Sequence, residues 1–194
     1  MAPKTSEQFE EIRRKSRQNI EQAALELFAH KGFHNTSISQ ISKAAKVSKG
    51  LLYNYYDSKE DLLHAIIDRA MDQDGAEIEA FLKSDLPPYQ KIVAVTEGAI
   101  QMVQADPHHW KLITSLSLQE DIMTQLKDLI KAKKDEMIGI VIEVFQQMGF
   151  TEPEKEAYLY GGLLDGIMLH YITLGEDYPI MEMKDYILKK YQVQ

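Results

Sequence analysis

Three tyrosines, two lysines and a glycine fall within the thirteen residues from Val47 to Lys59 of this 194-residue chain. Lysine ammonium and tyrosine hydroxyl groups can donate hydrogen bonds to phosphate oxygens, and a glycine lets a partner approach the backbone closely. A buried helix does not favour so many hydroxyls, and an ordinary surface helix does not favour so many rings. The segment therefore indicates a surface that another molecule contacts.

The rest of the chain offers little for catalysis or metal binding. It has no cysteine, and neither a nucleophile–base pair nor a metal-ligand constellation is visible. His108 and His109 are adjacent, but neighbours on a helix point about 100° apart, and no Asp, Glu or His at i+4 completes a set. Asp165 and His170 are five residues apart and do not stack on one helical face. We expect no catalytic residue, no cofactor and no metal.

Composition and charge limit the classes of protein that the chain can be. Hydrophobic content of 44% and charged content of 27% are ordinary for a soluble globular protein. No apolar run approaches the roughly 20 residues of a membrane span, and the N-terminus lacks a secretory signal, so we expect a cytoplasmic protein with no membrane partner. Residues 1–59 hold ten Lys or Arg against six Asp or Glu, whereas the remainder holds 12 against 24. This asymmetry indicates an N-terminal part that can meet phosphate.

Helical patterns surround the tyrosine-rich segment. A first helix ending before Gly32 is predicted by one apolar stripe, formed by Ile12, Ile20, Ala23, Ala24, Leu27 and Phe28. A capping box of Ser37 and Gln40 predicts a short second helix, and Ser48 can cap a short third one. Either Asp57 with Glu60 or Ser58 with Asp61 opens a longer helix that runs to residue 81.

Two short helices joined by a tight turn form the layout of a helix-turn-helix. The first of them braces the second against the core through Ile38, Ile41 and Ala45. The outer face of the second helix is then free to enter a major groove. Beyond Pro87 and Pro88, further helices are predicted near 88–104, 106–117, 120–149, 153–174 and 181–191. The sequence thus predicts an all-α fold of about nine helices, with a three-helix N-terminal unit and a larger helical body.

The stretch Ile20–Leu63 resembles the N-terminal domain of the tetracycline-repressor (TetR) family of bacterial transcriptional regulators. The matching elements are Ala-Ala-x-x-Leu-Phe at 23–28, Gly32-Phe33, Thr36-Ser37-Ile38, Ile41, Ala45, Val47-Ser48-Lys49-Gly50, Leu52-Tyr53, Tyr55-Tyr56 and Ser58-Lys59-Glu60. As a set these elements are highly specific, and they cover roughly a quarter of the chain.

The resemblance implies a homodimeric, repressor-like regulator that binds palindromic operator DNA and is released by a small-molecule effector. Residues 1–58 would form the DNA-binding domain and 59–194 the ligand-binding and dimerisation domain, with 59–81 as the connecting helix. The implied DNA-facing residues are Ser37, Lys46, Ser48, Lys49, Gly50, Leu51, Tyr53, Tyr55 and Lys59.

Within this set Tyr53 and Lys59 are expected to contact phosphate, and Lys49, Leu51 and Tyr55 to reach base edges. Leu51 can alternatively pack inward, and Tyr56 is expected in the core. Ser39 stands where many relatives carry a basic or larger polar residue, so readout from the bracing helix is expected to be weak. The basic residues at 13–17 are either a solvated helix face or an arm that touches the DNA backbone.

The C-terminal body carries fewer signals. In Gly161–Gly175, small residues at 161, 162 and 166 permit close helix contact, and in the family such a helix packs against its two-fold mate. An ordinary buried helix is the alternative, and the second interface helix is either Glu136–Met148 or the short terminal helix. Candidate residues for a pocket that binds an apolar or aromatic effector are Met102, His109, Trp110, Met123, Tyr158, Met168 and Tyr171.

The leading hypothesis is therefore a ligand-responsive DNA-binding regulator, in which an effector shifts the spacing of paired recognition helices. Two alternatives come from other classes: an architectural DNA-binding protein with no effector, and an all-α enzyme that uses the C-terminal cavity.

Overall fold

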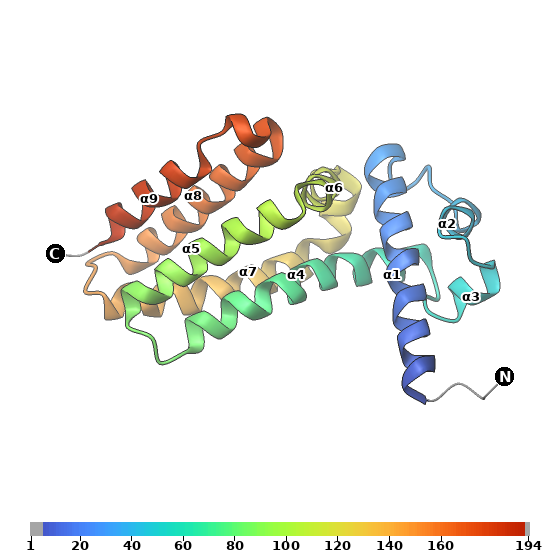
Figure 1. The fold of residues 1–194 in the computed structure, drawn as a ribbon, viewed down its shortest axis with the longest axis horizontal. Coiled ribbons are helices and arrows are strands. Elements are labelled where there is room, and N and C mark those ends of the chain that lie inside the picture. The colour runs from blue at the N-terminus through green and yellow to red at the C-terminus, as the bar shows by residue number, and fades with distance from the viewer. Residues whose placement is uncertain (1–5, 193–194) are drawn as a thin grey trace. The chain divides into compact units, whose positions relative to one another are not determined.

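The computed structural model describes residues 6–192, apart from the side chains of residues 6, 71–75, 77, 121, 123 and 125. The described residues form nine α-helices (Figure 1). These are α1 (Ser6–Lys31), α2 (Ile38–Ala44), α3 (Lys49–Tyr53), α4 (Lys59–Lys83), α5 (Pro88–Ala105), α6 (Pro107–Ser117), α7 (Glu120–Gln147), α8 (Pro153–Leu174) and α9 (Ile180–Tyr191), with a 3-10 turn at Gly175–Asp177. The predicted all-α fold is confirmed.

The chain forms two compact units. The first ends at Arg69 and also includes Leu112–Thr124, and the second comprises Ala70–Lys111 and the residues from Gln125 onward. Helix α4 therefore begins in the first unit and ends in the second. The division at residue 58 into DNA-binding and ligand-binding domains is a functional one and stays a prediction.

The first unit is built on the apolar face of α1. Ile20, Ala24 and Phe28 are completely buried, as the periodicity predicts, but Ile12 is 41% exposed. The helix nevertheless extends back to Ser6. Its exposed first half carries ion pairs between residues three or four apart, including Arg14 with Glu11 at 2.8 Å, which support a helix without burial.

The predicted caps set the limits of the short helices. Ser37 Oγ accepts a hydrogen bond from the Gln40 backbone N–H at 3.3 Å, and Gln40 Oε1 accepts one from the Ser37 N–H at 2.8 Å, which completes the capping box of α2. Ser48 Oγ caps α3 by accepting from the Leu51 N–H at 3.1 Å. Between the helices the backbone turns at Lys46, whose φ of 55° lies in the left-handed region.

Helices α5, α8 and α9 pack against one another in the second unit. Tyr160 and Tyr191 meet Phe145 in its core, with ring centroids 5.9 and 5.0 Å away. The Tyr160 hydroxyl lies 2.8 Å from Thr96 Oγ1 and donates to the Ile92 carbonyl at 3.2 Å, so this buried phenol is fully satisfied. Burial raises the pKa of Tyr160 above its ordinary value.

Candidate functional site

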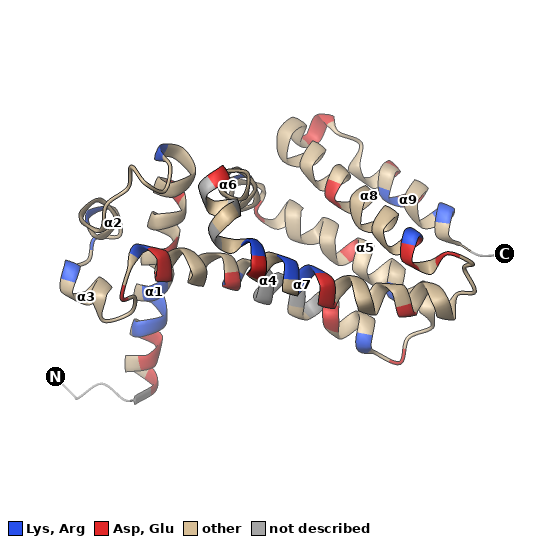
Figure 2. Ribbon diagram, turned by 180° about the vertical axis from the view of Figure 1, so that it is seen from behind, with Lys and Arg blue, Asp and Glu red and all other residues tan. Residues whose placement is uncertain are grey.

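The outer face of the helix-turn-helix consists of exposed polar groups. Ser37, Lys46, Ser48, Lys49 and Gly50 are all exposed, and the Tyr53 side chain is 51% exposed. Leu52 and Tyr56 of the same segment are buried. Helix α3, the expected recognition helix, therefore has one face in the core and one face in solvent, and its Lys49 is exposed. Figure 2 marks the positions of basic residues along this part of the chain.

No described part of the chain packs closely enough against Gly50 to require a glycine there. A Cβ added there would meet only the Ser48 Oγ at 3.9 Å, which is an ordinary van der Waals contact, and its backbone does not require a positive φ. A glycine inside a helix costs roughly 0.5–1 kcal/mol relative to alanine. A binding partner whose surface approaches the backbone of α3 closely would explain why a glycine stands at position 50.

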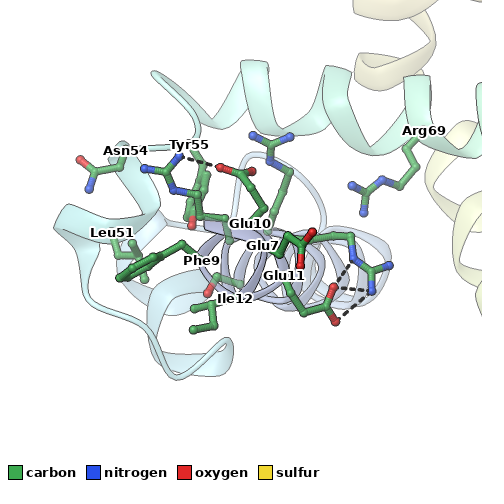
Figure 3. Close-up of a pocket in the computed structure, with 13 residues that line it drawn as sticks. Glu7, Phe9, Glu10, Glu11, Ile12, Leu51, Asn54, Tyr55 and Arg69 are labelled. Carbon is green, nitrogen blue, oxygen red and sulfur yellow. Dashed lines mark hydrogen bonds and ion pairs between the residues drawn. The ribbon is translucent and has the colours of Figure 1, made fainter. Parts of the chain in front are cut away.

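Leu51 and Tyr55 are half-buried, and they line an open groove of about 1000 Å³ beside the first half of α1 (Figure 3). Phe9 and Ile12 supply the apolar part of its α1 side. The Arg17 guanidinium lies 5.5 Å from the centroid of the Tyr55 ring, a distance that allows a cation–π contact. Leu51 and Tyr55 are thus partly exposed to solvent and partly covered by the groove beside α1. Their contact with base edges stays a prediction.

Lys59 holds the turn between α1 and α2. Its ammonium donates to the carbonyl oxygens of Phe33 at 2.7 Å and Thr36 at 3.1 Å, and it lies 4.3 Å from the Phe33 ring centroid. An ammonium group has three N–H donors, so two of them serve the fold. The side chain is half-buried, and its role as a phosphate contact stays a prediction.

Glu21 of α1 is a buried charged residue, with 7% of its surface exposed. One carboxylate oxygen accepts a hydrogen bond from the Tyr56 hydroxyl, and the other forms an ion pair with Arg69 of α4. Burial raises the pKa of Glu21, whereas the Tyr56 hydrogen bond and the charges of Arg69 and Arg17 act in the opposite direction. Sequence patterns predict the burial of Tyr56 but not this arrangement, because its members are 35 and 13 residues apart.

A second cavity, of about 450 Å³, lies wholly within the second unit. Its walls are mostly apolar and come from α4, α5, α7 and α8, with Leu82, Val95, Val141 and Leu164 among them. At its exposed side the Lys134 ammonium lies 4.0 Å from the Asp165 carboxylate. An apolar cavity with a few ionic groups is the usual form of a small-molecule site.

Two of the residues predicted from the sequence for a ligand site lie at this cavity, and their role in binding stays a prediction. Tyr158 and Met168 line it, whereas Met102, His109, Trp110 and Tyr171 are not among its described lining residues. Trp110 and Tyr171 instead pack against the core of the second unit, and the His109 ring contacts the Trp110 ring edge-on at 5.8 Å. The side chain of Met123 lies outside the described residues.

Helices α8 and α9 carry large apolar side chains in solvent. Leu159 is 47% exposed and Leu169 48% exposed, and Gly162 and Gly166 lie between them at helical spacing with nothing within 4 Å of an added Cβ. On α9, Met181 and Tyr186 are 50% and 69% exposed. The described part of the chain leaves these apolar residues of the two helices uncovered, and we refer to them together as the α8–α9 face.

None of the described helices is long and apolar enough to cross a membrane. Within the same part of the chain, no three His, Asp or Glu side chains are grouped so that they could hold a metal ion.

Comparison with known proteins finds bacterial transcriptional regulators, both by sequence and by fold. The profile described as bacterial regulatory proteins, tetR family, matches residues 20–66. The fatty acid metabolism regulator protein of Bacillus subtilis (strain 168) is 22% identical over 173 residues, which cover 86% of this chain and 89% of the relative. The HTH-type transcriptional regulator HbdR of Aromatoleum sp. (strain CIB) is 29% identical over 145 residues, which cover 74% and 63% of the two chains.

Among solved structures, the transcriptional regulator FadR from Bacillus subtilis in complex with stearoyl-CoA has a TM-score of 0.71 at 22% identity, covering 90% of this chain and 96% of that chain. A capped helix-turn-helix with a polar outer face, followed by a larger helical unit, defines a DNA-binding transcriptional regulator. The match over residues 20–66 confirms the resemblance of the Ile20–Leu63 stretch to the TetR family of bacterial regulatory proteins.

Proposed function

We propose that this regulator is a homodimeric repressor that binds a palindromic operator and is released by a small amphipathic effector. The observation that carries the DNA-binding part is the exposed face of α3, where Lys49, Gly50 and Tyr53 face solvent without a structural need for the glycine. Lysine and tyrosine donors suit phosphate oxygens, and the glycine suits close approach to a groove wall.

The dimer is supported by the α8–α9 face. Leu159, Gly162, Gly166 and Leu169 follow one another at spacings of three and four residues, so they share one side of α8. A helix with small residues between leucines can pack closely against its symmetry mate, and two helices from each subunit make a four-helix interface. Exposed Met181 and Tyr186 favour α9 as the second interface helix, rather than Glu136–Met148.

The effector site is the cavity between α4, α5, α7 and α8. Its apolar walls suit an acyl or aromatic part, and Lys134 can pair with an anionic head. The similarity to a regulator that was solved with stearoyl-CoA makes long-chain acyl-CoA thioesters the first compounds to test.

Release follows from linkage between the two sites. An effector that prefers a conformation in which the paired α3 helices no longer match the operator lowers DNA affinity by its differential binding energy, typically about 1–3 kcal/mol. Helix α4 belongs to both compact units and is the segment through which such a change would pass.

The experiment is a binding titration on duplex DNA from the region upstream of the chain's own gene, with and without stearoyl-CoA and a panel of small apolar compounds. We expect tight binding to this duplex, weaker binding to a scrambled duplex, and a loss of affinity with one compound class. Equal affinity for both duplexes would favour the architectural alternative instead. Unchanged operator affinity with every compound, despite measurable compound binding, would contradict effector release.

A further inference from the structure

A buried carboxylate joins three segments of the first unit. Glu21 lies in α1, Tyr56 follows α3 by three residues, and Arg69 lies in α4. The two oxygens of the Glu21 side chain have different partners, the Tyr56 hydroxyl at one and the Arg69 guanidinium at the other. The open groove beside α1 reaches the Arg69 side chain, which Figure 3 shows on α4 facing α1.

Because Glu21 contacts both Tyr56 and Arg69, the positions of these two side chains depend on each other. A carboxylate that is removed from water must be paired, because an isolated buried charge is strongly unfavourable. If Arg69 moves away, the Glu21 side chain must either follow it or remain buried with the neutral Tyr56 hydroxyl and the weaker effect of the Arg17 charge. In the first case the acceptor of the Tyr56 hydroxyl moves, and in the second the electrostatic balance at that hydroxyl changes.

Tyr56 is attached firmly to the recognition helix. Its backbone N–H donates to the Leu52 carbonyl at 3.1 Å, and its side chain is 4% exposed. Because the ring is packed in the core and the backbone is bonded to Leu52, we expect a shift of Tyr56 to displace the C-terminal end of α3. The exposed face of α3 is the one proposed to enter the major groove.

At the other end, Arg69 is the last residue of α4 that belongs to the first compact unit. The same helix continues without interruption and supplies Ile78 and Leu82 to the wall of the effector cavity. One continuous helix thus carries both a wall of that cavity and the cation that holds Glu21.

We propose that Arg69 is a positioning residue for the recognition helix, acting through Glu21 and Tyr56 and transmitting displacement of α4 to α3. The inference rests on the proposed function, since it assigns the route by which the effector cavity acts on DNA binding. It predicts that Arg69 and Tyr56 influence operator affinity as one unit.

The test is a double-mutant cycle. Operator and scrambled duplex affinities are measured by fluorescence anisotropy for Arg69→Gln, Tyr56→Phe and the double variant. Lys83→Gln is the matched control, because Lys83 lies on the same helix in an exposed ion pair with Glu79. Arg69→Lys keeps the charge and is expected to recover part of the affinity.

We expect each single variant to weaken operator binding by about 2-fold to 30-fold, with scrambled-duplex affinity and Lys83→Gln close to the parent. The double variant should lose no more than the weaker-binding single variant, because both changes break the same link. A double variant whose loss is the product of the two single losses would overturn the proposal.

Two further measurements keep the result decisive. If Arg69→Gln does not fold, the pair Glu21→Gln with Arg69→Gln removes the buried charge, and parent-like operator affinity in this pair would overturn the proposal. Hydrogen exchange of residues 49–56 needs no DNA: faster exchange in Arg69→Gln, with the second unit unchanged, supports the link, and parent-like exchange contradicts it. If the parent binds neither duplex, the proposed function fails, while the exchange result still decides the role of Arg69.

Discussion

The ammonium of Lys59 lies 2.7 Å from the carbonyl oxygen of Phe33 and 4.3 Å from the centroid of its ring. A residue expected to bind phosphate therefore also closes the turn between α1 and α2. Charge-assisted hydrogen bonds of this kind contribute roughly 1.5–3 kcal/mol each. Binding and stability must be measured separately for this side chain.

For Lys59→Met we expect a lower midpoint of urea unfolding, because the two carbonyl contacts are lost while the apolar stem still covers Phe33. We also expect the same loss of affinity on operator and scrambled DNA, with the slope of log affinity against log salt reduced by about one phosphate contact. The check is a salt titration of a variant whose folding is confirmed by circular dichroism. An unchanged affinity and an unchanged salt slope would show that the third N–H does not reach phosphate.

For Gly50→Ala, stability and function should move in opposite directions. The first turn of α3 gains at most roughly 0.5–1 kcal/mol, because alanine loses less backbone entropy and no described atom within the chain obstructs its Cβ. Operator affinity should fall, because the added methyl group stands between the backbone and the groove wall. Thermal unfolding and duplex titration of one sample provide both readings, and a variant that is stabilised yet binds as the parent would refute the groove-facing position of Gly50.

Leu169→Glu places a charge on the α8–α9 face. We expect monomers by sedimentation at micromolar concentration and a loss of operator affinity, because a palindromic site needs two linked recognition helices. Leu118→Glu is the control, since Leu118 is 73% exposed and lies outside α8 and α9. If Leu169→Glu and Leu118→Glu were both dimeric, or both monomeric, the α8–α9 face would not be supported as the interface.

Met168→Trp fills the cavity of the second unit. Operator affinity without effector should stay close to that of the parent, whereas the response to stearoyl-CoA should weaken because the apolar part of the ligand loses its space. Met102→Trp is the comparison, because Met102 is half-buried on α5 but is not among the described residues that line the cavity. If only Met102→Trp blocked the response, the effector site would lie elsewhere.

Tyr160 gives a prediction for alkaline pH. Its pKa is raised in the folded chain by burial, so the folded state keeps a proton that the unfolded state loses above about pH 10. This contribution to stability is present below that pH and is lost as the pH rises towards the folded pKa. Tyr160→Phe should be less stable at pH 7 by about 1 kcal/mol, and its unfolding free energy should fall less steeply between pH 9 and pH 11 in urea titrations. An equally steep fall would contradict the pKa shift of Tyr160.

Much of the fold could be predicted because its signals are local. The capping box at Ser37 and Gln40 and the cap at Ser48 are found as predicted. Of the two caps considered for α4, the structure has Ser58 Oγ accepting from the Asp61 N–H at 2.9 Å. Each of these contacts joins residues three positions apart, and such spacing is visible in a sequence.

Contacts between distant residues were not predictable in this way. Glu21 lies on α1 beside the apolar Ala24 and Leu25 and the basic Arg17. No periodic pattern indicates that Tyr56 and Arg69 will meet it. The cavity of the second unit could not be predicted from the sequence either, because four helices supply its walls and their packing sets which residues face it. Tyr158 and Met168 were identified by residue type alone, and residue type equally suggested Trp110 and Tyr171, which pack into the core.

The most direct test of DNA recognition by α3 is a nuclease-protection experiment on the region upstream of the chain's own gene. A dimer that presents two copies of α3 should protect a symmetric site whose half-sites lie one helical turn, about 34–36 Å, or a multiple of it apart. The protection should weaken as salt rises, and it should disappear with Gly50→Ala at a concentration where the parent still protects. Uniform protection, or a symmetric site that Gly50→Ala protects as well as the parent does, would contradict recognition through this face.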